Sequence, residues 1–327
     1  MTHVAVVIVG FRNGAEVRDC IALLGASSHA DFSVHVCENG GAPAFADLVA
    51  EVAAIVPDLA AVATGDRMVE HRHGTLAGGQ AVHLYDAGAN LGYAGGINVC
   101  FAAIATEGSY DSVWILNPDT EPQPQALAAL RAHQQAGPYG IVGSRLVLKE
   151  SRRIQLYGGR WRKWMARGFN IGLGEAADAM PDVTAIEREL DYVAGASMYA
   201  PRAYVESVGA FDERYFLYYE ETDWCFRRGD WRLGYAHDSV VIHAHGSTIG
   251  SSVSRATRSA LSVYLDERNK LLFTRRFDGA ILPVVALFTL ALTVQYAKAG
   301  AWKNFRIALA GWWAGLRGEA GFPPRFG

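Results

Sequence analysis

The first half of the chain alternates short β-branched runs with stretches of helical periodicity, and this alternation constrains the fold more than any other feature. Strands are expected at Val4–Val9, Phe32–Cys37, Val82–Tyr85 and Ser112–Leu116, and helices at Val17–Leu24, Ala44–Ile55 and Ile97–Ala105. Strands that alternate with helices build a parallel sheet covered by helices. We therefore predict an α/β fold, with a Rossmann-like sheet flanked by helices.

Length and composition limit what such a chain can be. With 327 residues, half of them hydrophobic, it can bury the core of one large domain or of one domain with an appendage. The net charge of -3 gives the whole molecule no electrostatic footprint for nucleic acid. The four cysteines show no C-x-x-C spacing, so neither a zinc site nor a disulfide is implied. Val4–Val9 is too short for a signal peptide, and a cytoplasmic protein is expected.

The segment Pro57–Gln80 interrupts the alternation, and an extended loop or a small insertion is expected there. Its His71 and His73 could bind a metal, or they could be two solvated loop histidines. From Gly140 onward the pattern becomes strand-rich and aromatic, and after Ala256 it becomes helical.

Polar residues follow several of the expected strands. Glu38–Asn39, Asn90 and Asn117–Asp119 each come just after a strand-like run. Because ligands bind beyond the carboxyl ends of strands in such sheets, these residues should converge on one crevice. Asp119 could hold a hard divalent cation that shares its ligands with substrate phosphates. Alternatively, Asp119 caps a helix that begins near Pro122.

A glycine-rich turn lies between two of these positions. In Ala89–Asn98, glycines allow the backbone to approach a ligand, and a helix N-terminus that could face phosphate follows. The segment is neither a P-loop nor a G-x-G-x-x-G fingerprint. A tight strand-to-helix turn is the alternative interpretation.

An acidic group, Glu220-Glu221-Thr222-Asp223, follows the aromatic stretch Phe211–Tyr219. Packing against aromatic rings raises the pKa of a carboxyl group toward the range of a general base. Asp223 and Arg227 are four residues apart, as in a helical ion pair, so Asp223 has a structural interpretation and Glu221 is the catalytic candidate.

Two histidines beside a glycine and two hydroxyl residues, in His243–Thr248, follow the strand-like Ser239–Ile242. A histidine at this strand end could ligate a metal or contact a diphosphate. The alternative is a histidine that satisfies a local hydrogen bond.

Four elements carry candidate chemistry: Ala89–Asn98, Asn117–Asp119, Glu220–Asp223 and His243–Thr248. In this order and at these separations, they resemble family 2 glycosyltransferases. The rhamnosyltransferase-like branch, which builds bacterial cell-wall and surface polysaccharides, is the most similar, over roughly residues 4 to 276. The resemblance implies a GT-A fold over residues 1–276, a nucleotide-diphosphate-sugar donor, a divalent metal (Mg²⁺ or Mn²⁺) and inversion at the anomeric carbon. Residues 277–327 would then form a C-terminal helical segment.

Individual residues carry the resemblance. Asn90–Gly96 matches the family's Asn-Leu-Gly-x-Ala-Gly-Gly turn, and Asn117–Asp119 is similar to its Asp-x-Asp metal motif. Glu38 stands where the family has an aspartate that contacts the nucleoside, Gly195–Ser197 resembles its small-residue strand, and Gly10–Asn13 departs from its Asn-Tyr-Asn form. The donor-binding residues implied are Val9, Phe11, Glu38, Asn39, Asn90, Gly92, Gly95, Gly96, Asn117, Asp119, Gly195 and Ala196.

The resemblance also implies catalytic and metal-binding roles. Glu221 takes the place of the expected base, one methylene longer than the aspartate of the family; otherwise Glu220 or Asp223 deprotonates the acceptor. His243 fits the strand-end histidine that can complete a metal site with Asp119.

The expected donor is a dTDP- or UDP-sugar, and the expected acceptor is a glycan or a polyprenyl-diphosphate-linked sugar. L-Rhamnose is favoured by resemblance alone, and a hexosyl- or galactofuranosyltransferase that uses a UDP donor remains open. A degenerate sugar-nucleotide-binding protein without turnover is the alternative of another class.

Two segments suggest a membrane-linked acceptor. A basic strip interleaved with Trp161 and Trp164 could meet anionic headgroups or an acceptor pyrophosphate, or it could be a solvated hairpin. The strip comprises Arg152, Arg153, Arg160, Arg162, Lys163 and Arg167.

The tail carries an aromatic stripe at helical spacing that suits an interfacial helix. The alternative is a stripe that packs in the core or in a homodimer contact. The stripe is Trp302, Phe305, Leu309, Trp312, Trp313 and Leu316. Ala280–Val294, fifteen mostly apolar residues, is shorter than the roughly twenty of a spanning helix, so peripheral attachment at the inner face of the cytoplasmic membrane is expected.

Overall fold

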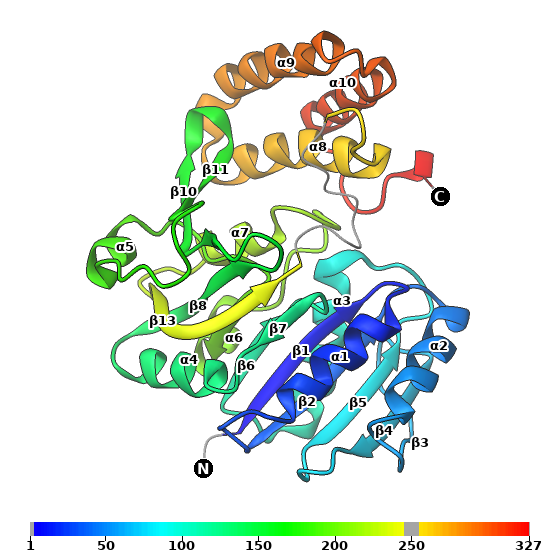
Figure 1. Cartoon of the computed structure of the whole chain (residues 1–327). Coiled ribbons are helices and arrows are strands. Elements are labelled where there is room, and N and C mark those ends of the chain that lie inside the picture. The colour runs from blue at the N-terminus through cyan, green and yellow to red at the C-terminus, as the bar shows by residue number, and fades with distance from the viewer. Residues whose placement is uncertain (1–2, 245–254, 327) are drawn as a thin grey trace.

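A computed structural model describes residues 3–244 and 255–326 of the chain. Within these residues, one mixed sheet of eleven strands forms the centre of the molecule (Figure 1). Its strands run in the order β3-β4-β5-β2-β1-β6-β12-β8-β13-β7, and β9 pairs with β8.

The four strands expected in the first half are present and parallel. They are β1 (Val4–Gly10), β2 (Phe32–Glu38), β5 (Ala81–Asp86) and β6 (Ser112–Leu116). All residues of β1 are buried, because both faces of this part of the sheet are covered. Val4, Val6 and Ile8 pack with α1 (Gly14–Leu24) and α2 (Ala42–Ala53), and the alternate residues pack with α3 (Gly92–Glu107).

The structure differs from the expectation in two places. The segment Pro57–Gln80, expected as an extended loop or a small insertion, contains β3 (Ala60–Ala61) and β4 (Glu70–Thr75), and β4 pairs antiparallel with β5 along its whole length. Helix α3 begins at Gly92, five residues before the predicted start at Ile97. In both places the residues carry weak signals, since histidines and glycines favour neither strands nor helices.

The second half extends the sheet beyond β6. Strand β12 (Ser197–Pro201) runs antiparallel between β6 and β8 (Tyr139–Leu148), and β13 (Arg232–His243) runs parallel to β8. The remaining strands here are β7 (Thr120–Pro122) and β9 (Ile154–Leu156), and the helices are α4 (Ala126–Gln135), α5 (Val183–Glu189), α6 (Arg202–Val208) and α7 (Glu220–Phe226). Four residues of the basic strip, Arg160, Arg162, Lys163 and Arg167, lie in a hairpin of β10 (Gly158–Arg162) and β11 (Arg167–Ile171), with one 3₁₀ turn, Lys163–Met165, at its tip. The other two, Arg152 and Arg153, come before β9.

Three helices complete the chain: α8 (Ala260–Phe277), α9 (Leu282–Lys298) and α10 (Trp302–Arg317). They lie together beyond the end of the sheet to which the β10–β11 hairpin also extends (Figure 1). Helix α10 packs on α8 through small residues, since a Cβ on Gly311 would lie 2.3 Å from the carbonyl oxygen of Tyr264. The boundary at residues 276–277 coincides with the end of α8, and the division into two domains stays a prediction.

The apolar segment is longer than its composition suggested. Gly279–Lys298 is helical over 20 residues, with a mean hydropathy of 1.9 in its most apolar window. By length and composition it could cross a membrane, so the argument that it is too short does not hold. Only 28% of that window is buried inside the molecule.

Candidate active site

The predicted site lies where the chain reverses its direction of travel across the sheet. From β1 the chain adds β2 and β5 on one side and then returns to place β6 on the other. Ligands bind at this kind of switch point, beyond the carboxyl ends of the parallel strands. Gly10, Glu38 and Leu116 end three adjacent strands here, so the polar residues that follow them share one edge of the sheet.

Glu38 is fully buried at the end of β2. Its Oε1 accepts hydrogen bonds from the backbone N–H groups of Arg12 (2.9 Å) and Gly40 (2.7 Å). Its Oε2 is buried without a hydrogen-bond partner among the described residues. Burial, with a contribution from Asp86, raises the pKa of Glu38. A buried oxygen of this kind costs free energy until a donor reaches it.

The glycine-rich turn is fixed by side chains from both of its ends. Asn90 Oδ1 accepts a hydrogen bond from Gly92 N–H (3.0 Å), and Asn39 Nδ2 donates to the Gly92 carbonyl (2.9 Å). Gly92 has a φ of 72°, and a Cβ there would lie 2.1 Å from the carbonyl oxygen of Phe216. Only glycine fits this position, because both the backbone conformation and the space exclude a side chain.

Two further glycines of the turn serve close packing. A Cβ on Gly96 would lie 2.6 Å from Val9 Cγ1, and one on Gly95 would lie 2.5 Å from Leu91 Cβ. Val9 is 8% exposed, so it contributes to this packing at the end of β1. Phe11 is 38% exposed just beyond the same strand.

Tyr93 connects the turn to the rest of the site. Its hydroxyl lies 2.9 Å from Asn117 Oδ1 and 3.1 Å from the Gly195 carbonyl oxygen, the two acceptors within reach of its one proton. The Asn117 N–H donates in turn to the Ala196 carbonyl (3.1 Å). Burial, followed by the charges of Glu220, Glu221 and Asp119, raises the pKa of Tyr93 well above its ordinary value. The residues predicted from three separate motifs therefore meet around one tyrosine.

Asp119 and His243 lie side by side. Asp119 Oδ1 is 3.2 Å from His243 Nε2, and the side chains are 10% and 7% exposed. His243 Nδ1 lies 2.8 Å from Gln155 Oε1. When Nδ1–H donates to Gln155, Nε2 presents its lone pair on the side of Asp119, as in a metal-ligating histidine oriented by a second residue. Asp119 is followed by β7 and not by a helix, so the helix-capping alternative is wrong. His245–Thr248 lie outside the described residues.

These two side chains fit a divalent cation. A carboxylate oxygen and an imidazole nitrogen 3.2 Å apart have the separation of two ligands of one ion. The mixed oxygen and nitrogen set suits Mn²⁺ better than Mg²⁺, which prefers oxygen alone.

Glu220 and Glu221 begin α7. Glu220 is buried and Glu221 is partly buried, and each has a buried Oε2 without a hydrogen-bond partner among the described residues. Burial raises the pKa of Glu221, and burial together with the charge of Glu221 raises that of Glu220 well above its ordinary value. A Cβ on Gly195 would lie 3.3 Å from Glu221 Cγ, so the absence of a side chain at Gly195 leaves room for Glu221.

Asp223 is occupied by structural partners. Its Oδ2 accepts from Arg227 Nε (2.7 Å), and its Oδ1 lies 3.0 Å from Arg276 Nη1 and accepts from the Tyr215 hydroxyl (3.2 Å). Burial raises its pKa, and the two arginines oppose that change. The helical pair with Arg227 is present as predicted, so we do not propose Asp223 as the base.

The loop before α7 is strained and held from α8. Phe216, Tyr218 and Tyr219 all have positive φ angles, of 66°, 70° and 77°. Such conformations cost about 1–3 kcal/mol each and persist where the surroundings impose them. Here Asn269 Nδ2 lies within 3.0 Å of the carbonyl oxygens of Tyr215, Leu217 and Tyr218. Arg268 donates to Tyr215 (2.9 Å) and to Arg214 (3.3 Å).

Sequence reasoning missed Tyr93, Gln155 and Asn269 as parts of this site. Tyr93 stood inside a recognised motif, at its variable position, so the motif gave it no role. Gln155 and Asn269 lie in a short strand and in a helix with no motif of their own, and only the fold brings them to the site.

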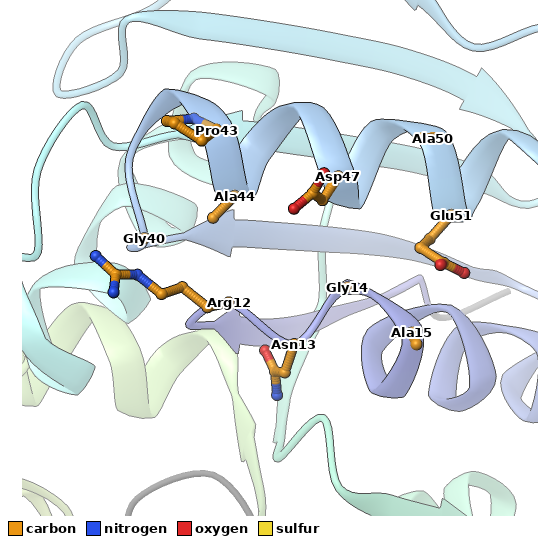
Figure 2. Close-up of a pocket in the computed structure, with 10 residues that line it drawn as sticks. All are labelled: Arg12, Asn13, Gly14, Ala15, Gly40, Pro43, Ala44, Asp47, Ala50 and Glu51. Carbon is orange, nitrogen blue, oxygen red and sulfur yellow. The ribbon is translucent and has the colours of Figure 1, made fainter.

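A separate pocket of about 510 Å³ opens between α1 and α2 (Figure 2). Its lining includes Arg12, Asn13 and Gly40 at the strand ends, and Asp47 and Glu51 on α2. It shares Arg12 and Gly40 with the surroundings of Glu38, but none of the predicted donor-binding residues lines it. The pocket is therefore not the predicted donor site.

Two sequence relatives are glycosyltransferases. The chain is 26% identical over 218 residues to the low-salt glycan biosynthesis hexosyltransferase Agl10 of Haloferax volcanii, covering 65% of this chain and 67% of Agl10. It is 25% identical over 208 residues to the N-acetylglucosaminyl-diphospho-decaprenol L-rhamnosyltransferase of Mycobacterium tuberculosis, covering 58% of this chain and 68% of that one. No family model matches the chain.

The fold is shared with solved glycosyltransferases. The mannosyltransferase PcManGT from Pyrobaculum calidifontis, solved with GDP-Man and Mn²⁺, superposes with a TM-score of 0.52 at 12% identity, over 96% of this chain and 86% of that one. The chain therefore has the GT-A fold. The predicted fold and the predicted class of protein, a glycosyltransferase, are confirmed. The site residues, the metal, the donor and the acceptor stay predictions.

Proposed function

We propose that the chain is an inverting, metal-dependent glycosyltransferase of the family 2 type, which transfers a sugar from a nucleotide diphosphate to an acceptor hydroxyl. The observation that carries the proposal is the meeting of three motifs at Tyr93. Its hydroxyl joins Asn117, in the loop Asn117–Asp119 (the proposed metal loop), to Gly195, which lies two residues before β12. Glu221 also lies against Gly195, so its carboxylate and the loop Asn117–Asp119 both adjoin the segment Gly195–Ala196.

Glu38 is the proposed contact for the nucleoside. Its Oε1 is engaged by two backbone N–H groups, and its Oε2 is buried without a partner among the described residues. A hydroxyl or N–H group of the nucleoside would satisfy that oxygen. The backbone of Arg12 and Gly40 holds the longer side chain in place, which compensates for its extra methylene.

Asp119 and His243 are the proposed metal ligands, with Gln155 orienting the imidazole. A bound divalent ion would neutralise the negative charge that develops on the diphosphate as it leaves.

Glu221 is the proposed base. Its carboxylate takes the proton of the acceptor hydroxyl while that oxygen forms a bond to the anomeric carbon. The bond from this carbon to the diphosphate oxygen breaks on the opposite face, which inverts the configuration. Its raised pKa brings the base closer to neutrality, where proton transfer is most effective.

The donor is proposed to be a dTDP- or UDP-sugar, with L-rhamnose or a hexose as the transferred unit. The acceptor is proposed to be a glycan on a polyprenyl diphosphate, the class of acceptor named for the mycobacterial relative. A sugar-nucleotide-binding protein without turnover is the second candidate, favoured by the substitutions at Glu38 and Glu221.

A lipid-linked acceptor agrees with the surface of α9. Val284, Leu287 and Val294 are 57%, 70% and 44% exposed and follow helical spacing along one face. Contact of such an apolar face with water is unfavourable, and exposed apolar patches of this kind mark protein or membrane interaction sites. The hairpin tip lies beside this face, since the rings of Trp164 and Phe288 are 5.1 Å apart.

The basic strip and the tail contribute unequally to this surface. Arg162 and Lys163 are exposed at the hairpin tip, whereas Trp161 packs inward against Phe273, 4.7 Å between ring centroids. In α10, Trp302 and Trp313 are 62% and 55% exposed, whereas the Trp312 Nε1–H donates to Ala286. We propose that α9 and the hairpin tip lie in the surface of an anionic membrane, with the chain peripheral on its cytoplasmic face.

The deciding experiment is a thermal-shift screen of dTDP-, UDP- and GDP-sugars, with and without Mn²⁺, followed by transfer assays with the best donor. A ligand at a hundred times its dissociation constant adds about 2.7 kcal/mol to the free energy of unfolding. A Mn²⁺-dependent shift that is absent in Asp119→Asn, together with turnover, supports the proposal. A shift without turnover on any acceptor supports the binding protein, and no shift with any nucleotide overturns both.

A further inference from the structure

Three histidines form a row across the edge of the sheet opposite to β13. In the strand register His35 of β2 faces His83 of β5, and His83 faces His73 of β4. The ring centroids of both neighbouring pairs are 4.7 Å apart. His71 lies two residues before His73 and therefore on the same face of β4, with its ring 5.3 Å from that of His83. These residues are not two solvated loop histidines.

The hydrogen bonds show which ring nitrogens can bind a ligand. His71 Nδ1 lies 3.2 Å from the Ala63 carbonyl oxygen, which can only accept, so Nδ1 carries the proton and Nε2 carries the lone pair. His71 Nε2 lies 3.1 Å from His83 Nδ1. His35 has both nitrogens engaged, Nδ1 with the Tyr85 hydroxyl and Nε2 with Ser33 Oγ, each at 2.8 Å. His35 therefore supports the His83 ring from behind by stacking.

A carboxylate completes the cluster. Glu107, at the C-terminus of α3, places Oε1 3.6 Å from His83 Nδ1. Two ligands of a tetrahedral ion, each bonded at about 2.1 Å, are separated by about 3.4 Å. The separations of His83 Nδ1 from His71 Nε2 and from Glu107 Oε1, 3.1 and 3.6 Å, lie on either side of that value.

The cluster is open to solvent on one side, because the side chain of Glu107 is 39% exposed.

The ligand atoms of His35, His83 and Glu107 all lie within 4.8 Å of one another, and His71 Nε2 adjoins His83 Nδ1. We infer that His83 and Glu107, together with the neighbouring His71, His73 and His35, form a site for a borderline transition-metal ion of the Zn²⁺ class, separate from the proposed catalytic metal. The ligand types favour Zn²⁺, Ni²⁺ or Co²⁺ over Mg²⁺, because imidazole is a nitrogen ligand. Asp119 and His243 lie on β7 and β13 or next to them, at the other end of the strand order, so one ion cannot serve both sites.

A metal at this position would join elements that are otherwise held weakly. Strand β4 pairs only with β5 and with the two-residue β3, among the described strands. The ion would connect β4 and β5 to the C-terminus of α3, and through the His71–Ala63 contact to the loop before β4. Such a site stabilises the folded chain in proportion to its occupancy.

The inference is tested on the full chain, first freed of metal with a chelator, by titrating Zn²⁺ alone, without nucleotide. We expect one equivalent to bind and to raise the thermal unfolding midpoint. The affinity should fall at least tenfold in His71→Gln and in His83→Gln, and it should be unchanged in His29→Gln, outside the cluster, and in Asp119→Asn. Co²⁺ in place of Zn²⁺ should give the visible absorption of a tetrahedral ion, which His83→Gln loses.

Other outcomes overturn the inference. No binding of Zn²⁺ to the full chain removes the site, and binding that survives in both cluster variants moves it elsewhere. Binding that is lost in Asp119→Asn assigns the ion to the catalytic position. If His83→Gln does not fold, His71→Gln decides, because His71 is partly exposed on β4, which pairs beyond β5 with only the two-residue β3 among the described strands. A Mn²⁺-dependent nucleotide shift is measured separately, so the proposed transferase function stands or falls on its own.

Discussion

The hydroxyl of Tyr93 lies 2.9 Å from Oδ1 of Asn117, and this contact joins the glycine-rich turn to the proposed metal loop. The topology brings both residues to one edge of the sheet, since α3 starts beyond β5 and Asn117 directly follows β6. The hydroxyl also reaches the Gly195 carbonyl, so one side chain sets the relative positions of three segments.

Removal of this hydroxyl should weaken both stability and transfer. We expect Tyr93→Phe to lower the free energy of unfolding by about 0.5–1.5 kcal/mol, the net value of a typical buried hydrogen bond. The transfer rate should fall roughly tenfold to a hundredfold, because small misplacements of reacting groups are costly. Denaturant unfolding and kcat/KM measure the two effects. A variant with full activity would show that the contact has no positioning role.

Glu221→Gln should reduce transfer by about 10² to 10⁴-fold, the usual contribution of a general base, while donor binding is retained. In the unmodified chain the base must be ionised to act, and burial raises its pKa. Activity should therefore rise with pH through a pKa above that of an ordinary glutamate, and it should be lost as pH falls. A kcat–pH profile with a saturating donor checks this.

Glu220→Gln is the matched control for Glu221. The folded pKa of Glu220 is raised above its unfolded value, so its protonated form is favoured in the fold, and stability is lost as pH rises through that raised pKa. The amide should remove this loss and stabilise the chain at pH 8 by roughly 1–3 kcal/mol. If Glu220→Gln abolishes transfer and Glu221→Gln does not, the base is Glu220.

Much of the fold could be predicted because local pattern and global topology agree in the first half. The strand run Val4–Val9 is β-branched and buried on both faces, so its periodicity leaves few alternatives. Histidine-rich β4 was missed, because its pairing with β5 depends on tertiary contacts and not on apolar alternation. The tail helix was predicted, but its buried face was not, since α10 packs through Gly311 and Ala314 and leaves Trp313 exposed.

The residues of the candidate site also fall into two groups, those whose position could be predicted from the sequence and those whose position could not. Residues at strand ends, such as Glu38 and Asp119, could be predicted because the parallel topology alone brings strand ends together. The residues that orient them could not, because Gln155 and Asn269 come from elements whose position relative to the site is set by long-range packing.

Gln155 should control metal affinity without touching the metal. Loss of the residue that orients a ligating histidine costs about 10- to 100-fold in affinity. We expect Gln155→Leu to weaken the Mn²⁺ dependence of nucleotide binding by this factor, measured by titration calorimetry in the presence of a nucleoside diphosphate. Asp119→Asn should abolish the dependence. Unchanged Mn²⁺ affinity in both variants would place the catalytic metal elsewhere.

Asn269 should be essential for the loop that carries the acidic helix. Its amide satisfies carbonyl groups of a loop with three strained residues, so Asn269→Leu leaves these groups unpaired in a buried setting. We expect a loss of about 2–4 kcal/mol in the free energy of unfolding, measured in urea. Asn170→Leu is the control on the exposed hairpin, and a change within about 0.5 kcal/mol is expected for it. A similarly small change in Asn269→Leu would show that the loop holds its own conformation.

Membrane attachment should depend on the exposed face of α9 and not on the helix as a whole. Removal of α9 and α10 would also expose α8, whose Tyr264 and Leu271 pack with them, so truncation confuses unfolding with detachment. Leu287→Ser with Val294→Ser changes only side chains that are 70% and 44% exposed. We expect this double variant to keep its unfolding midpoint and to bind anionic vesicles at least tenfold more weakly in co-sedimentation, because burial of a leucine in an apolar phase is worth about 1.5–3 kcal/mol. Leu23→Ser, at a 40% exposed position on α1, is the control and should bind as the unmodified chain does. Equal binding of the unmodified chain, the double variant and Leu23→Ser would exclude α9 as the anchor. If the double variant binds as the unmodified chain does and the binding of both disappears in high salt, the attachment is due to the arginines and lysine of the hairpin alone.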